Sequence, residues 1–153
     1  MEDYKHYLNL CIELTNKGDF DKALPAIEKS IELNSNNPLS YFSKAIVYHN
    51  MGQFRAAYEN YDRAIKLNPE MIDAYYNKAQ TILAFDNPTE SELKEALSEL
   101  EKAVELDPKF IDAHYYSATI KKKLGDYKGA IESLDKVLAI EPQAPYSRAL
   151  KKL

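Results

Sequence analysis

The side chains best suited to chemistry in this sequence are three histidines and one cysteine. His6, His49 and His114 lie far apart along the chain, and no His, Cys and Asp spacing resembles that of a metal site. Serine and aspartate residues are scattered without the context of a catalytic triad, and no glycine-rich phosphate loop is present. Cys11 has no second cysteine with which to form a disulfide. We therefore expect no enzyme activity, no cofactor and no metal ion.

The other candidates for molecular recognition are aromatic residues. The chain has 153 residues, of which 12 are tyrosine and 5 are phenylalanine, and it has no tryptophan. Tyrosine offers rigid contact area with few rotamers to freeze, and it is enriched at binding hot spots. A binding role depends on whether the elements that carry these rings place them on one surface.

A 34-residue repeat determines where these residues fall. The string GDFDKA that begins at Gly18 returns as GQFRAA at Gly52 and as GDYKGA at Gly125. The second interval is 73 residues, which is two periods plus five, and the five extra residues lie at about 86–90. We expect a single domain, 1–153, with repeats at 4–37, 38–71, 72–110 and 111–144 and a capping segment at 145–153.

Each repeat is predicted to form two antiparallel α-helices. Apolar residues recur at steps of three and four on both sides of the glycine, which is the period of an amphipathic helix. The glycine supplies the left-handed backbone that ends the first helix, and Asp19 and Asp126 are expected to cap the second. The prolines that follow the second helix are Pro69, Pro108 and Pro142.

Small residues recur at one position in each helix, where they let two helices approach to roughly 8–10 Å. Cys11 holds one of these positions, so we predict a buried and inert thiol there. The small residues of the first helices are Cys11, Ala45, Ala79 and Ala118, and those of the second helices are Ala23, Ala57, Ala96 and Ala130.

This pattern resembles the tetratricopeptide repeat family over residues 4–144, because the 34-residue period carries an early aromatic residue, small residues and a closing proline. The departures are local. No tryptophan occupies the early aromatic position, and the third repeat lacks the turn glycine. The resemblance implies an all-α, right-handed solenoid of four antiparallel helix pairs plus a short C-terminal helix. It also implies that the first helices line a concave groove that binds a partner's peptide or helix. The early aromatic position holds Tyr7, Tyr41, Tyr75 and His114.

Helical spacing selects the first-helix residues that would face this groove. They combine aromatic and aliphatic side chains with amides and two carboxylates, a mixture that suits peptide capture. The alternative is that the aromatic rings only pack against neighbouring repeats. We predict partner-binding residues at Asn9 and Ile12, at Phe42, Ser43 and Ile46, at Asp73, Tyr76, Asn77 and Gln80, and at Asp112, Tyr115, Tyr116 and Thr119. The same side also carries Lys5, Leu8, Asn16, Leu39, Asn50 and Lys123.

One subgroup of the family grips the C-terminal carboxylate of heat-shock chaperones with Lys, Asn, Asn, Lys and Arg at five groove positions. All five differ here when the positions are counted from the first repeat, and four differ when they are counted from the second. Asp73 and Asp112 would repel a carboxylate. We therefore expect a ligand with apolar or aromatic side chains instead. The two sets are Leu8, Ile12, Ser43, Asp73 and Asn77, and Phe42, Ile46, Asn77, Asp112 and Tyr116.

Two segments depart from the repeat. Thr89 and Glu92 fit a capping box, so the second helix of the third repeat should begin about one turn early. The insertion before it is predicted to be a tolerated surface loop, with a partner contact as the alternative. The segment 145–153 is predicted to form a short helix whose small area leaves the end of the stack partly exposed, which favours a homodimer or a longer parent chain. Its apolar residues are Tyr146, Ala149, Leu150 and Leu153.

Composition narrows the class of partner. The net charge of −4 argues against nucleic acid and anionic membranes, which need a clustered positive patch. No signal peptide and no apolar run of transmembrane length is present, so a cytoplasmic protein is expected. The sequence thus predicts a scaffold or adaptor that binds another protein or peptide. The alternative is a structural adaptor that self-assembles through its repeat ends or its groove.

Overall fold

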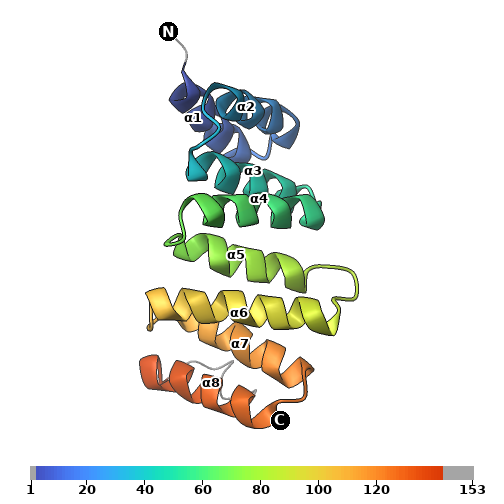
Figure 1. The fold of residues 1–153 in the computed structure, drawn as a ribbon, viewed down its shortest axis with the longest axis vertical. Coiled ribbons are helices and arrows are strands. Elements are labelled where there is room, and N and C mark those ends of the chain that lie inside the picture. Colours follow the sequence, from blue (N-terminus) through green and yellow to red (C-terminus); the bar gives the residue numbers. More distant parts are fainter. Residues whose placement is uncertain (1–2, 143–153) are drawn as a thin grey trace. The chain divides into compact units, whose positions relative to one another are not determined.

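The structure, a computed structural model, describes residues 3–142 and contains eight α-helices and no strand within them (Figure 1). The predicted all-α class is confirmed. The chain divides between Phe85 and Asp86 into two compact units, unit 1 and unit 2. The predicted helix at 145–153 lies outside the described residues, and the single domain stays a prediction. Unit 1 holds α1 (Tyr4–Asn16), α2 (Phe20–Leu33), α3 (Pro38–Asn50), α4 (Phe54–Leu67) and α5 (Ile72–Leu83); unit 2 holds α6 (Glu90–Leu106), α7 (Ile111–Lys123) and α8 (Tyr127–Ile140).

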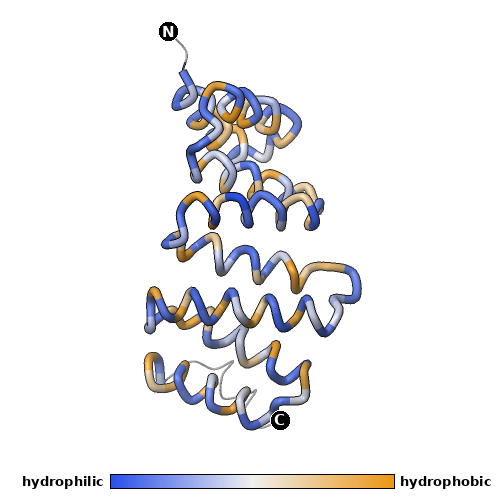
Figure 2. The backbone as a smooth tube through the Cα atoms, viewed as in Figure 1, coloured by the Kyte–Doolittle hydropathy of each residue, from blue (hydrophilic) through white to orange (hydrophobic). Residues whose placement is uncertain are grey.

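Each helix packs on its neighbours through one apolar side. In unit 1, α1 packs on α2, α3 on α4, and successive pairs meet through the contacts of α3 with α1 and α2 and of α5 with α4. In unit 2, α7 lies against both α6 and α8. Hydrophobic and hydrophilic residues alternate along these helices (Figure 2), as expected for elements that bury one side only. The first helices α1, α3, α5 and α7 begin at the first residue of each predicted repeat.

The turns inside the repeats follow the glycines. Gly18, Gly52 and Gly125 have φ of 78°, 76° and 84°, the left-handed backbone predicted for them. The second helices α4 and α6 end two residues before a proline, as predicted. In the first repeat α2 ends at the corresponding residue, Leu33, although Ser35 stands in place of the proline. The proline is therefore not required to end the second helix.

The two predicted aspartate caps differ. Asp126 accepts a hydrogen bond from the Gly129 amide at 2.9 Å, so that cap is confirmed. The prediction for Asp19 is wrong, because its side chain makes no capping bond and instead lies 3.9 Å from Lys22 Nζ. A Cβ at Gly129 would collide with the Asp126 carboxylate. Lys22 occupies the matching position in the first repeat, where its Cβ would meet an aspartate side chain placed like that of Asp126.

The second helix of the third repeat begins early, as predicted. Thr89 Oγ1 accepts from the Glu92 amide and Glu92 Oε1 accepts from the Thr89 amide, both at 3.0 Å. This capping box starts α6 at Glu90, so the helix has 17 residues where α2, α4 and α8 have 14. The insertion is thus absorbed by three extra helical residues and a longer connection.

The small residues predicted at the helix contacts lie inside the packed helices. All eight are buried, and Cys11 has no exposed surface. Burial raises the pKa of the Cys11 thiol, and a hydrogen bond with Thr15 opposes that shift only partly. The predicted burial of the Cys11 thiol is confirmed, and its inertness stays a prediction.

The early aromatic side chain of the second, third and fourth repeats is bonded to the loop before it. Tyr41 Oη donates to the Ser35 carbonyl, and Tyr75 Oη donates to the Pro69 carbonyl, both at 2.8 Å. His114 forms the same bond from Nε2 to the carbonyl of Pro108, also at 2.8 Å. Histidine therefore replaces tyrosine without loss of this contact.

Candidate protein-binding surface

The predicted partner-binding residues fall into two groups. Those on α1, α3 and α5 lie in unit 1, and we call them the first-helix face. The other four lie on α7 in unit 2, so the two groups are considered separately. The first-helix face consists of Asn9, Ile12, Phe42, Ser43, Ile46, Asp73, Tyr76, Asn77 and Gln80, and the α7 group consists of Asp112, Tyr115, Tyr116 and Thr119.

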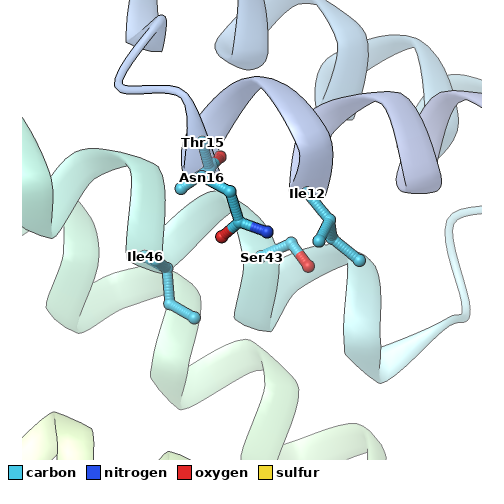
Figure 3. Close-up of a pocket in the computed structure, with 5 residues that line it drawn as sticks. All are labelled: Ile12, Thr15, Asn16, Ser43 and Ile46. Atoms are coloured by element: carbon cyan, nitrogen blue, oxygen red, sulfur yellow. The ribbon is translucent and has the colours of Figure 1, made fainter.

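An open hollow lies on the first-helix face between α1 and α3. Its empty volume is about 290 Å³, including the solvent space at its mouth. In Figure 3 the side chains of Asn16, Ser43 and Ile12 converge on the space between the two helices, with Ile46 further along α3. Ile12 is 44 % exposed, which is high for a large aliphatic side chain. The residues that line the hollow are Ile12, Thr15, Asn16, Ser43 and Ile46.

Sequence reasoning found most of this lining but not all of it. The predicted groove side includes four of the five residues, and Thr15 was missed. Thr15 lies one helical turn after Ile12, so spacing alone would have placed both on one side of α1. Leu8, which the same spacing placed in the groove, is instead buried in the core between α1 and α2.

Two residues of the first-helix face also contact the buried core of unit 1. Phe42 packs edge-on against Tyr61, with ring centroids 5.7 Å apart. Asn77 hydrogen-bonds the Tyr61 hydroxyl. Burial raises the pKa of Tyr61, and the bond to Asn77 opposes that rise without cancelling it. Tyr61 on α4 therefore stays neutral and contacts both Phe42 on α3 and Asn77 on α5.

The α5 part of the face is polar. Gln80 Nε2 donates to Tyr76 Oη at 2.6 Å, which holds the Tyr76 ring along the helix. Thr81 Oγ1 donates to the Asn77 carbonyl at 2.7 Å and lies 3.2 Å from His49 Nδ1 on α3. Burial lowers the pKa of His49, which favours the neutral ring in this contact. Asp73 is exposed and is the only charged residue among the nine of the face.

The α7 group contains a tyrosine pair. The rings of Tyr115 and Tyr116 meet edge-on, with centroids 5.1 Å apart and planes at 78°. Tyr115 packs against Ala118 and the α8 core residue Leu134, so this ring contributes to folding as well as to the surface. Asp112 is exposed, and Thr119 donates to a backbone carbonyl of its own helix.

Two other features, a metal-holding cluster and a membrane-spanning helix, are not found in residues 3–142. No group of three or more His, Cys, Asp or Glu side chains in this range is placed to hold a metal ion. None of the helices in the same range has the length and apolar character needed to cross a membrane.

Comparison with known families agrees with the repeat pattern. The family profile for the anaphase-promoting complex, cyclosome, subunit 3 matches residues 16–103, which is more than half of the chain. The profile for regulator of microtubule dynamics protein 1-3 matches residues 74–152, also just over half. The chain belongs to the tetratricopeptide repeat family. Among curated proteins, no sequence gives a significant match.

Solved structures share the fold. A crystal structure of MamA has a TM-score of 0.86 at 24 % identity, covering 94 % of this chain and 76 % of MamA. A thermophilic repeat protein from Thermus thermophilus has a TM-score of 0.70 at 24 % identity, covering 95 % and 77 %. The first repeat domain of Spaghetti, bound to the HSP90 peptide SRMEEVD, has a TM-score of 0.74 at 21 % identity, covering 80 % and 94 %. The predicted helical-repeat solenoid fold is confirmed.

Proposed function

We propose that this chain is a non-enzymatic protein-interaction module that binds a segment of a partner protein on the first-helix face of unit 1. The observation that carries the proposal is the open hollow between α1 and α3, three of whose lining residues were predicted for partner binding from the sequence. An aliphatic side chain that stays exposed beside a hollow favours a ligand that covers it. The Spaghetti domain, which shares the fold, holds a peptide.

The ligand class that we propose differs from that peptide. The five positions of the chaperone-type carboxylate clamp lack its lysines and arginine in either register, and Asp73 stands at one of them. A carboxylate placed near Asp73 would be repelled. We propose a partner segment without a terminal carboxylate anchor, recognised through apolar or aromatic side chains.

Capture of partners from cell extract tests the proposed function. We expect a Tyr76→Ala variant to recover specific partners at least tenfold less well than wild type, because truncating an aromatic hot spot costs ~2 kcal/mol or more. Leu67→Ala is the matched control, since it removes a 42 % exposed apolar side chain of unit 1 outside both groups. Circular dichroism checks that the variants stay folded. Equal recovery by Tyr76→Ala and wild type would contradict partner binding through this part of the first-helix face.

A second candidate function is self-assembly through α8. Tyr127 and Ile131 on α8 are 64 % and 47 % exposed. The matching residues of α2 and α4 are half-buried, because the next first helix packs on them. An uncovered apolar stripe on the last described helix favours an oligomer as the alternative. The matching residues are Phe20 and Leu24 on α2 and Phe54 and Tyr58 on α4.

Light scattering across a concentration series tests this second candidate. If α8 joins two copies, the wild-type mass should rise towards that of a dimer with concentration, and Ile131→Glu should keep the chain monomeric, because the carboxylate would lose its hydration in the interface. A wild-type protein that stays monomeric at all concentrations would rule self-assembly out.

A further inference from the structure

The hollow between α1 and α3 is small. Its cavity volume, without the open solvent at its mouth, is about 90 Å³, well below the roughly 300–1,000 Å³ of pockets for whole small molecules. Ile12 and Ile46 supply apolar surface from the two helices. A ligand of this size that buries apolar surface is a single side chain with the chain segment that bears it.

The polar groups of the hollow are not all used by the protein. Thr15 Oγ1 donates to the Cys11 carbonyl at 2.7 Å and is satisfied. Ser43 is only 9 % exposed, yet within the described residues its hydroxyl has no hydrogen-bond partner. The Asn16 amide likewise has none in that part of the chain. Buried hydroxyls are nearly always hydrogen-bonded, to protein or to water, so a ligand group that enters the hollow can use the bonding capacity of Ser43.

Ser43 differs in this from other hydroxyls of the first helices. Thr15, Thr81 and Ser117 each donate to the carbonyl four residues earlier, at 2.7–2.8 Å. That bond is the usual solution for Ser and Thr inside helices. The Ser43 hydroxyl lines the hollow without forming it. The Ser43 hydroxyl can therefore still donate and accept a hydrogen bond inside the hollow.

None of the five lining side chains carries a charge. A carboxylate or ammonium group placed among Ile12, Ile46 and Ser43 would lose its hydration without gaining a counter-ion, which disfavours a charged ligand side chain. The lining therefore selects for an uncharged aliphatic group.

We propose that this hollow binds an aliphatic side chain of an extended partner peptide, while Asn16 and Ser43 hydrogen-bond the peptide backbone. An extended segment presents free N–H and C=O groups to these two side chains, whereas a helix uses its own backbone groups internally. The inference rests on the proposed function and specifies the ligand of the same surface.

Selection from a library of random twelve-residue peptides displayed on phage, with the full chain as bait, tests the proposal. The enriched peptides should share Val, Leu or Ile at one position. In synthetic copies, replacing that residue with Asp or Lys should weaken binding at least tenfold, measured by fluorescence polarisation. Enrichment of peptides without a shared aliphatic residue, or of no specific peptide, would overturn the proposal.

Variants of the protein test whether the selected peptides bind in the hollow. Ile12→Asp and Ser43→Ala should each weaken the selected peptides, the first at least tenfold and the second several-fold. Leu33→Asp is the matched control, since Leu33 is a similarly exposed aliphatic residue of unit 1 on α2, and it should leave affinity unchanged. If Tyr76→Ala weakens binding but the two hollow variants do not, the hollow is wrong and the proposed function stands. If none of these variants matters, peptide capture by this face is wrong as well.

Discussion

Replacing Tyr61 with alanine is expected to lower the free energy of unfolding by about 3–5 kcal/mol. Tyr61 is 2 % exposed and is the largest fully buried side chain among the described residues. Its removal leaves a cavity beside Ala45 and Ala57, which are too small to fill it. It also removes the edge-on contact with Phe42. Chemical denaturation followed by circular dichroism measures the loss.

Tyr61→Phe is the matched control for this prediction. Phenylalanine keeps the ring and its contact with Phe42, and it removes only the hydroxyl that bonds Asn77. We expect a loss of about 1 kcal/mol, the usual net value of one hydrogen bond. Equal losses for the two variants would contradict the packing role of the ring. A loss below about 1 kcal/mol for Tyr61→Ala would contradict the buried position itself.

Replacing Lys78 with alanine is expected to cost about 2–3 kcal/mol of unfolding free energy. Lys78 is 4 % exposed, its Nζ lies 3.0 Å from Asp62 Oδ1, and it stands 4.9 Å above the Tyr58 ring. Breaking a buried ion pair costs about 3–5 kcal/mol. We expect a smaller cost than this for Lys78→Ala, because Asp62 is partly exposed and keeps its ion pair with Lys66 at 2.9 Å.

The preceding repeat supplies a matched control. Lys44 and Glu28 occupy the positions 34 residues before Lys78 and Asp62, but they lie 3.9 Å apart and are more exposed. We expect Lys44→Ala to cost less than about 1 kcal/mol, as exposed pairs do. Equal effects of the two alanine variants would show that burial does not decide the strength of this repeated pair.

The cost of Lys78→Ala should also depend on pH. Burial of Asp62 opposes its ionisation, but hydrogen bonds and charges from Lys66 and Lys78 outweigh burial and lower its pKa below the ordinary 3.8. A lowered pKa in the folded state stabilises the fold above pH 3.8, and this contribution disappears as the pH falls through the lowered value. The difference between wild type and Lys78→Ala should therefore shrink below about pH 4.

Features that repeat along the chain were predictable from the sequence. The glycine turns, the buried small residues and the capping box of Thr89 depend on local backbone geometry, which residue types at fixed spacing determine. The outcome at Asp19 was not predictable from residue type, because Asp19 and Asp126 occupy the same position of the repeat and only Asp126 caps its helix. The residue three positions later is Lys22 in one repeat and Gly129 in the other, and the Lys22 ammonium lies 3.9 Å from the Asp19 carboxylate.

Contacts between repeats were harder to predict. The pair of Lys78 with Asp62 spans 16 residues, and a pattern of helical period within one repeat does not connect them. A signal was present, because Lys44 and Glu28 have the same separation one repeat earlier. The hollow was partly predicted through Ile12 and Ser43, but the missing hydrogen bond of Ser43 depends on atomic positions that spacing does not determine.

Because of the bonds from the early aromatic position, we expect the loops between repeats to tolerate changes in length less well than the turns within repeats. Loops 34–37, 68–71 and 107–110 all have four residues, and in each a carbonyl accepts a bond from the helix that follows. The five-residue insertion at about 86–90 instead lies at a turn within a repeat, where it lengthens both the connection and α6. Length variation among close relatives should therefore accumulate in these turns, and a short reporter peptide is best introduced there.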